Sequence, residues 1–149
     1  SAASDVYKRQ VQAVVPLMKK EKYGRIINVI STSVRTPIQG LGVSNTLRGA
    51  VASWAKTLSA ELGPYGITVN NILPGFTQTA RLDSLIESKA KSRGITSDEL
   101  ATEMKLAIPV RRFAEPSETA ALAGFLASPS AAFISGESIR VDGGATPSI

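Results

Sequence analysis

The sequence contains no cysteine and no histidine. Without cysteine there are no disulfides and no thiolate metal sites, and without histidine the commonest general base and the commonest metal ligand are both missing. We therefore expect no metal site, and any chemistry must use hydroxyl groups, carboxylates, lysine or arginine.

Long hydrophobic runs and clustered charges are also missing. No stretch approaches the roughly 18 unbroken apolar residues that a membrane-spanning helix needs, and the N-terminus has no apolar core like that of a signal peptide. The net charge is +5, but no run of lysines and arginines exceeds two residues. We therefore expect a cytoplasmic protein with no membrane partner. A basic nucleic-acid-binding domain is the disfavoured alternative, and it predicts a steep salt dependence of duplex binding.

What is present suits one domain or part of one. The chain has 149 residues, 43% of them hydrophobic, which is enough for a single core. Its first ten residues fit badly with the rest, because residues 5–10 (DVYKRQ) match the in-frame translation of a transposase adapter used in shotgun DNA sequencing. We interpret residues 1–10 as a non-native segment, with an ordinary polar helix start as the alternative, and residues 11–149 as a domain that lacks its first half.

Hydrophobic periodicity predicts alternating helices and strands. The predicted helices are 11–22, 43–62, 80–92, 97–107 and 115–127, and the predicted strands are 25–31, 67–73 and 138–141. The first two strands are nearly continuous apolar runs, which is typical of parallel strands covered on both faces. The order implies an α/β fold with right-handed crossovers, the C-terminal part of a doubly wound parallel sheet. The polar segment 79–107 is predicted to be a mobile lid.

Ligands of such sheets lie beyond the carboxyl ends of the strands. Two segments with suggestive chemistry follow the predicted strands there, residues 31–33 after the first and residues 74–79 after the second. On geometry alone, these two segments form the candidate site.

Several motifs, in a fixed order, resemble the second half of the short-chain dehydrogenase/reductase family, in the style of 3-oxoacyl-(acyl carrier protein) reductases. The motifs are GRIINVIS at 24–31, an S-x-x-x-R helix start at 44–48, GITVNNILPGF at 66–76, IPVRRFAEPSETAALAGFLAS at 108–128 and ISGESIRVDGG at 134–144. The resemblance covers about Val11 to Gly144. It implies an incomplete NAD(P)-binding Rossmann-like domain of an oxidoreductase.

The resemblance also assigns roles residue by residue. Ser31 falls on the family's substrate-orienting serine, which hydrogen-bonds the reacting carbonyl or hydroxyl. Thirteen residues further on, Ser44 stands where the family has its catalytic tyrosine, and Arg48 stands where it has a lysine. The i, i+4 spacing keeps this pair on one helix face. The resemblance thus makes Ser31, Ser44 and Arg48 the candidate catalytic residues, with Arg48 also holding the cofactor ribose.

The altered pair lacks the acid-base character that the family needs. A tyrosine phenol, its pKa lowered by a neighbouring ammonium, donates or accepts a proton as hydride moves. The hydroxyl of Ser44 is far less acidic, and the guanidinium of Arg48 does not release a proton at working pH. Plainer alternatives stay open, because Ser31 can satisfy a strand end and Ser44 can cap a helix or lie in its first turn.

Five residues resemble the family's P-G-x-x-x-T stretch, which packs on the nicotinamide and binds its carboxamide and phosphates. These cofactor-binding candidates are Pro74, Gly75, Phe76, Thr77 and Thr79. The plainer alternative for the two threonines is a turn residue and a helix cap. The glycine-rich phosphate turn and the residue that selects the cofactor belong to the family's first half, so the resemblance implies NAD or NADP without deciding between them.

The family's remaining active-site residue is an asparagine in the preceding helix. It falls near Ala3, inside the suspect segment, and is not seen. Tyr23 and Tyr65 are not substitutes for the missing phenol, because both precede predicted strands and so lie at the opposite edge of the sheet.

The function that the resemblance implies is hydride transfer between a nicotinamide cofactor and a small carbonyl or secondary alcohol substrate. We expect the chain itself to be an inactive fragment of that enzyme. The alternative is a non-catalytic family member, a nucleotide-binding or scaffolding subunit that lost the tyrosine and lysine. The apolar faces of helices 11–22 and 43–62 exceed what one sheet face must hide, and the family pairs these helices between subunits, so a homodimer or homotetramer is expected.

Overall fold

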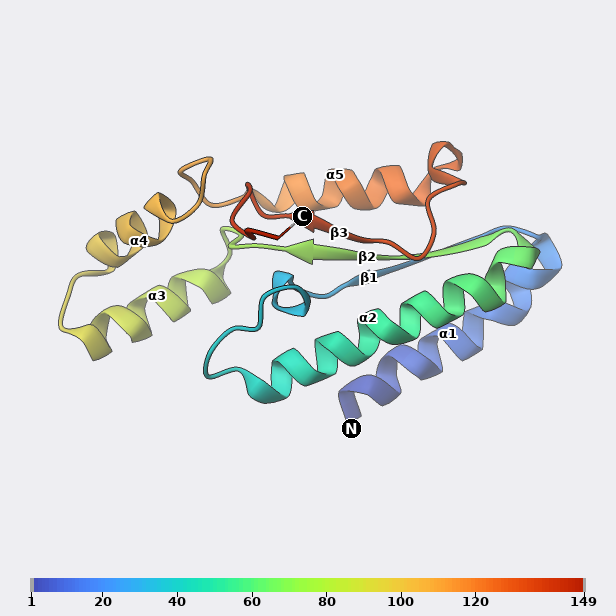
Figure 1. The fold of residues 1–149 in the computed structure, drawn as a ribbon, viewed down its shortest axis with the longest axis horizontal. Coiled ribbons are helices and arrows are strands. Elements are labelled where there is room, and N and C mark those ends of the chain that lie inside the picture. The colour runs from blue at the N-terminus through green and yellow to red at the C-terminus, as the bar shows by residue number, and fades with distance from the viewer. Residues whose placement is uncertain (1, 149) are drawn as a thin grey trace.

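The computed structural model describes residues 2–148, which fold around a three-stranded parallel sheet (Figure 1). The strands β1 (Gly24–Val29), β2 (Ile67–Pro74) and β3 (Ser138–Val141) lie side by side in that order. In the register, Ile26 of β1 lies opposite Val69 of β2, and Ile72 of β2 lies opposite Ile139 of β3. The α/β fold with a parallel sheet, predicted from the order of the periodic segments, is confirmed.

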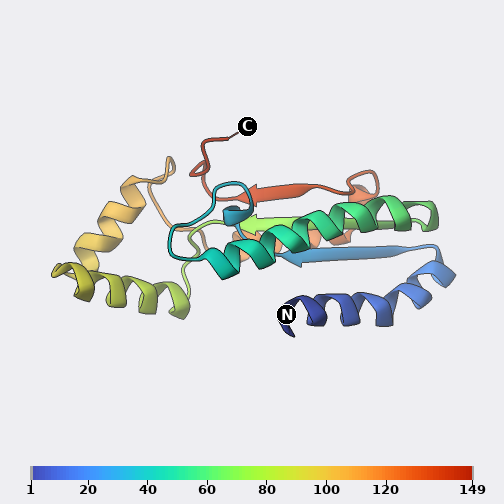
Figure 2. The same cartoon turned by 60° about the horizontal axis from the view of Figure 1, so that its bottom comes forward.

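Helices cover both faces of the sheet (Figure 2). The helices α1 (Ala2–Glu21) and α2 (Gly42–Leu62) lie on one face, and α5 (Pro116–Ala127) lies on the other. Because strand side chains alternate between faces, Val69 packs in the cluster beneath α1 and α2, whereas Ile72 packs against Leu126 of α5. No helix in the described part of the chain is both long enough and apolar enough to cross a membrane.

The helix α1 differs from its prediction, because it begins at Ala2 and not at Val11. Its buried side continues upstream of the expected start: Tyr7 packs on the cluster around Ile30, and Val11 and Val15 pack on the cluster around Val69. Spacing by four residues places these side chains on one helix face. Ala3, near which the resemblance puts the missing asparagine, lies in the first turn of this helix. The non-native origin of residues 1–10 stays a prediction.

Buried asparagines tie the three strands together. The Nδ2 group of Asn28 donates to Oδ1 of Asn71 at 3.0 Å, and Nδ2 of Asn71 donates to Oγ of Ser138 at 3.0 Å. On the other side of β2, Asn70 donates to the carbonyl of Ile134 at 2.8 Å. Since buried polar groups are costly unless paired, these bonds fix the register of the strands whose ends carry the site.

The segment predicted as a lid forms a helical hairpin, α3 (Ala80–Arg93) and α4 (Ser97–Leu106), beyond the carboxyl ends of the strands (Figure 1). It has a core of its own, formed by buried apolar side chains. These are Leu82, Ile86, Ala90, Leu100, Ile108 and Phe113. Gly94 ends α3 in the left-handed conformation, at φ 68°, and the turn is completed by a capping box in which Thr96 and Glu99 bond each other. Hydrogen bonds from Thr96 lower the pKa of Glu99. Lid mobility stays a prediction.

Within residues 2–148, β1 is paired along one edge only, with β2. Its last residue, Val29, is 51% exposed, whereas β2 is buried from Ile67 to Leu73. β1 is therefore an edge strand of this sheet, and β2 is its centre.

Candidate functional site

Three of the predicted site residues line one cavity at the carboxyl end of β1, here called the Ser31 cavity, with a volume of about 440 Å³. Its walls are Ser31, Ser33, Ile38, Leu41, Ser44, Arg48, Arg81, Ser84 and Leu85. Ser31 and Ser33 come from the turn after β1, Ser44 and Arg48 from the start of α2, and Arg81 from the start of α3. The structure thus brings Ser31, Ser44 and Arg48 together, as the resemblance implied.

Ser31 is held by the short 3-10 turn η1 (Thr32–Val34), of which it is the N-cap. Its Oγ accepts a hydrogen bond from the backbone N–H of Ser33 at 3.1 Å. This bond uses a lone pair of the hydroxyl and leaves its proton free. Ser31 therefore caps the turn that follows β1, which is the plainer alternative. Its hydroxyl proton is still available to donate to a ligand in the cavity.

Ser44 and Arg48 are bonded to each other. Nε of Arg48 donates to Oγ of Ser44 at 3.1 Å, and Nη1 donates to the carbonyl of Ile30. The one-turn separation along α2 makes the first bond possible, and the second ties α2 to the end of β1. The hydroxyl of Ser44 is an acceptor in this pair, so its own proton remains available to a third group.

The stretch that follows β2 divides between two places. Pro74, Gly75 and Phe76 line a second, mainly apolar cavity of about 380 Å³ together with Ser31, here called the Pro74 cavity. Gly75 is required by close packing, because a Cβ there would lie 2.9 Å from Cα of Asp142. The further walls of the Pro74 cavity are Thr32, Thr36, Ile38, Asp142, Ala145, Thr146 and Pro147.

Thr77 and Thr79 line neither of these cavities. Thr77 donates to the carbonyl of Gly75 at 3.3 Å, and Oγ1 of Thr79 accepts from the N–H of Leu82 at 3.4 Å as the N-cap of α3. These contacts are those of a turn residue and a helix cap. A part for either threonine in cofactor binding stays a prediction.

None of the three tyrosines lines the Ser31 cavity. The hydroxyl of Tyr23 donates to the carbonyl of Ala127 at 3.0 Å, and the ring of Tyr65 lies 4.1 Å below Nζ of Lys19. Tyr7 lies in a separate hollow beside Trp54. Among the described residues, no phenol is therefore part of the walls of the Ser31 cavity. No cluster of Asp and Glu in the described residues is suited to a metal ion either.

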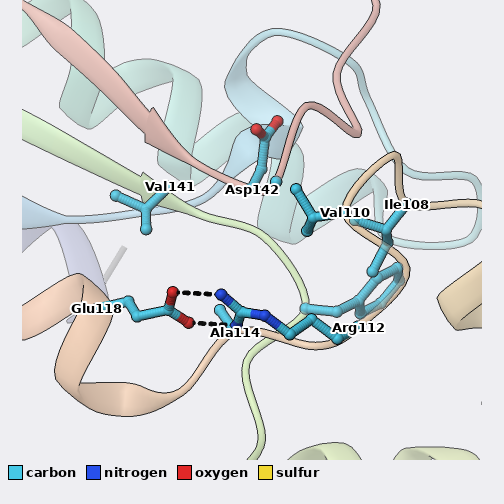
Figure 3. Close-up of a pocket in the computed structure, with 9 residues that line it drawn as sticks. Ile108, Val110, Arg112, Ala114, Glu118, Val141 and Asp142 are labelled. Atoms are coloured by element: carbon cyan, nitrogen blue, oxygen red, sulfur yellow. Dashed lines mark hydrogen bonds and ion pairs between the residues drawn. The ribbon is translucent and has the colours of Figure 1, made fainter.

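A third cavity, of about 160 Å³, lies between the end of β3 and the start of α5 (Figure 3), and is here called the Arg112 cavity. Arg112 and Glu118 both line it and are joined in a bidentate pair, with N···O distances of 2.6 and 2.7 Å. The bond from Arg112, reinforced by the backbone N–H of Glu115, lowers the pKa of Glu118 to about 2. The guanidinium of Arg112 is thereby neutralised inside the chain.

Asp142 borders both the Arg112 and the Pro74 cavities. Burial raises its pKa, but hydrogen bonds from Thr146 and Gly144 and the charge of Arg140 outweigh this effect, and the pKa is lowered overall. Its oxygens accept from the N–H groups of Gly144 and Thr146, each at 3.0 Å. Asp142 therefore shapes the turn after β3.

Sequence reasoning placed Ser33 in the candidate segment 31–33 without giving it a role, and it missed Arg81 and Ser84 as parts of the Ser31 cavity. Arg81 and Ser84 are three residues apart at the start of α3, so they share a helix face. A signal was present, because this helix directly follows the predicted cofactor stretch. The sequence did not predict that α3 packs near α2, because this is a tertiary contact.

Comparison with known proteins agrees with this fold. The family model described as Enoyl-(Acyl carrier protein) reductase matches residues 6–146, and the chain belongs to the short-chain dehydrogenase/reductase family. The match begins within the segment interpreted as non-native.

Individual relatives cover the chain nearly from end to end. It is 36% identical to the NADPH-dependent reductase BacG of Bacillus subtilis (strain 168), over 89% of this chain and 51% of BacG. It is 34% identical to a D-beta-hydroxybutyrate dehydrogenase of Rhizobium meliloti (strain 1021), over 91% of this chain and 53% of that enzyme. The crystal structure of YwfH, an NADPH-dependent reductase involved in bacilysin biosynthesis, superposes with a TM-score of 0.92 at 33% identity, covering 98% of this chain and 56% of YwfH. The chain thus spans about half the length of the relatives it matches.

Proposed function

We propose that this chain is the C-terminal half of an NAD(P)-dependent oxidoreductase that transfers hydride between the nicotinamide and a carbonyl or secondary alcohol substrate. One observation carries the proposal: Ser31, Ser44 and Arg48 line a single cavity at the carboxyl end of the sheet. Membership of a family whose relatives are reductases and dehydrogenases supports it.

The residues present fit the nicotinamide end of such a cofactor. The Pro74 cavity joins apolar walls from Pro74 and Phe76, which suit a flat ring, to the hydroxyl of Ser31. Ser31 and Ile38 are shared with the Ser31 cavity, so a ring on Pro74 lies beside the proposed reacting group. NADPH is the cofactor named for BacG and YwfH, and the proposal leaves NAD or NADP open for this chain.

When bound, the nicotinamide supplies or accepts the hydride. The hydroxyl of Ser31 donates to the substrate oxygen and orients it. The hydroxyl of Ser44, whose oxygen is already bonded by Arg48, holds the proton that the substrate oxygen gains or loses, either directly or through a water. The unused N–H groups of Arg48 hold the ribose hydroxyls. In this proposal Ser44 and Arg48 occupy the positions of the family's tyrosine and lysine.

A second candidate is a non-catalytic family member that binds nucleotide or serves as a scaffold. It is favoured by the bonds of Arg48, whose guanidinium is engaged by Ser44 and by the carbonyl of Ile30. In that case Ser44 and Arg48 only anchor α2 to the end of β1, and neither residue transfers a proton.

Assaying the complete protein against a broad panel of ketones and alcohols, with NADH and NADPH, decides between the two. Under the main proposal, at least one substrate is turned over, and Ser31→Ala reduces kcat by about 10²-fold or more. A protein that changes the fluorescence of the reduced cofactor but turns over no substrate supports the non-catalytic candidate. A complete protein that shows no cofactor binding and no turnover contradicts both candidates.

We further propose that two copies associate through α1 and α2. Support comes from apolar side chains left open on this face: Leu17 of α1 is 62% exposed and Val43 of α2 is 79% exposed. Light scattering on the complete protein tests the proposal. The substitution Leu17→Glu is expected to shift the equilibrium between oligomer and monomer toward the monomer.

A further inference from the structure

The Ser31 cavity has two guanidinium groups in its walls and no carboxylate. Arg48 borders it from α2 and Arg81 from the first turn of α3. Among residues 2–148, Arg81 takes part in no salt bridge. The nearest acid along α3, Asp83, is bonded instead by Gln78 at 2.7 Å. A cleft lined by charge of one sign attracts a ligand of the other sign.

The same cavity has an unused hydroxyl in its wall. Ser33 is only 4% exposed, and its Oγ has no hydrogen-bond partner within the described residues. Buried hydroxyls are nearly always paired, because an unpaired one has lost its water and gained nothing. The backbone N–H of Ser33 is already bonded to Ser31, so the turn holds this hydroxyl in place. Since this oxygen is shielded from solvent, its side chain must turn toward the cavity to meet a ligand oxygen, which would then be its partner.

We propose that the Ser31 cavity binds the carboxylate or phosphate of an acidic carbonyl substrate, with Arg81 and Ser33 as its donors and the charge of Arg48 beside them. The inference rests on the proposed function, because Ser31 is taken to hold the carbonyl of the same molecule. Guanidinium groups bind carboxylate and phosphate oxygens through paired, charge-assisted hydrogen bonds. The apolar walls from Ile38, Leu41 and Leu85 suit the carbon chain between the two ends.

The anionic group is assigned to the substrate and not to the cofactor because the two cavities differ. The nicotinamide candidates Pro74, Gly75 and Phe76 line the Pro74 cavity and not the Ser31 cavity. Arg81 lines only the latter of these two. The mainly apolar Pro74 cavity, whose one charged wall residue is the acid Asp142, is thus left to the ring, and the Ser31 cavity with its two arginines is left to an anionic group.

Calorimetric titration of the complete protein tests this inference without requiring turnover. The probes are keto acids of increasing length, pyruvate, acetoacetate and levulinate, each beside its methyl ester, with inorganic phosphate as competitor. We expect one acid to bind at least tenfold more tightly than its ester, and phosphate to displace it. Equal affinities for every acid and its ester overturn the inference, as does a failure of all the acids to bind at millimolar concentration.

Two variants and two controls assign the effect to the cavity. Arg81→Gln is expected to weaken binding of the acid about tenfold and to leave the ester unchanged, and Ser33→Ala is expected to act in the same direction with a smaller loss. Arg93→Gln removes the same charge from the same helix, at a residue bonded to Glu103 at 2.9 Å. Thr119→Val removes another unpartnered buried hydroxyl, in α5. If the controls weaken binding as much as the cavity variants, the inference fails.

A second arm asks whether the anion belongs to the nucleotide. Nicotinamide mononucleotide and nicotinamide riboside differ by one phosphate, and both are titrated into the protein and into Arg81→Gln. If Arg81→Gln abolishes the preference for the mononucleotide and spares that for the keto acid, the cavity holds nucleotide phosphate and the inference is overturned. Turnover without preference for acids contradicts the inference alone, whereas tight binding of acids without turnover contradicts the proposed function alone.

Discussion

Two arginine-lined cavities lie at the carboxyl ends of the strands, and they differ in what the chain places opposite the guanidinium. In the Arg112 cavity, Glu118 accepts two bonds from Arg112 and neutralises it (Figure 3). In the Ser31 cavity, Arg48 is bonded only to uncharged oxygens, and no carboxylate is among the walls. Arg112, whose charge is paired within the chain, serves the fold. Arg81, which borders the Ser31 cavity and takes part in no salt bridge among residues 2–148, is left to serve a ligand. Arg48 stands between the two, because its bonds anchor α2 to the end of β1 while its charge stays unpaired.

The largest expected effect comes from placing in the Ser31 cavity the tyrosine and lysine that the proposed function assigns to positions 44 and 48. In the complete protein, Ser44→Tyr combined with Arg48→Lys is expected to raise kcat by about 10²-fold, because a phenol beside an ammonium transfers protons far better than a serine. Ser44→Phe with Arg48→Lys, which lacks only the phenolic hydroxyl, is the control. A fall in kcat with the tyrosine variant contradicts the prediction and indicates a site adapted to serine and arginine.

Removing the guanidinium of Arg48 is expected to cost stability. Arg48→Met leaves the carbonyl of Ile30 and the hydroxyl of Ser44 without their donor, so the free energy of unfolding falls by about 1–3 kcal/mol. Urea unfolding measures it. Arg81→Gln, which removes a charge but no bond within the described chain, is expected to change stability by less than about 0.5 kcal/mol. Equal losses in the two variants contradict the distinction between anchored and available arginines.

The Arg112 cavity is expected to make stability depend on acid pH. The pKa of Glu118 is lowered to about 2 in the folded chain from an ordinary value of 4.5, so folding favours its ionised form. The resulting stabilisation is fully present above about pH 4.5 and is lost as the pH falls toward 2. Thermal unfolding between those limits measures the slope, and Arg112→Gln is expected to flatten it. Arg93→Gln, on the separate hairpin, leaves this carboxylate paired and serves as control.

The smallest expected effect on stability is that of Ser33→Ala. Its hydroxyl has no partner to lose, so the free energy of unfolding is expected to change by less than about 0.5 kcal/mol, or to rise slightly. Ser138→Ala is the matched comparison, because its hydroxyl accepts from Asn71 at 3.0 Å, and its loss is expected to cost about 1–2 kcal/mol. A large loss for Ser33→Ala shows that its hydroxyl already has a partner in the fold.

The sequence predicted the sheet well because its strands are short apolar runs bounded by glycine and proline. The strand predicted at 67–73 is observed as Ile67–Pro74, whereas the one predicted at 25–31 ends at Val29. The latter ends early because Ser31 caps η1, a local bond that periodicity does not report. The start of α1 was wrong because the compositional mismatch of residues 1–10 outweighed the apolar spacing of Tyr7 with Val11.

The site was predictable in its position and only partly in its members. Ser31, Ser44 and Arg48 were named through the family resemblance, and all three line one cavity. Arg81 and Ser84 were missed, since the cavity forms only where α3 lies near α2. The unpartnered hydroxyl of Ser33 is a property of the packed chain, and no spacing rule reports it.

The edge strand β1 has a practical consequence for anyone who produces this polypeptide. Along its outer rim, the main-chain amides and carbonyls face no neighbouring strand within residues 2–148, and such a rim is a template for strand addition. Expressed by itself, the polypeptide is expected to self-associate through its backbone. A separately expressed N-terminal half from a relative would compete for the same rim, which makes the chain a natural candidate for split-enzyme complementation.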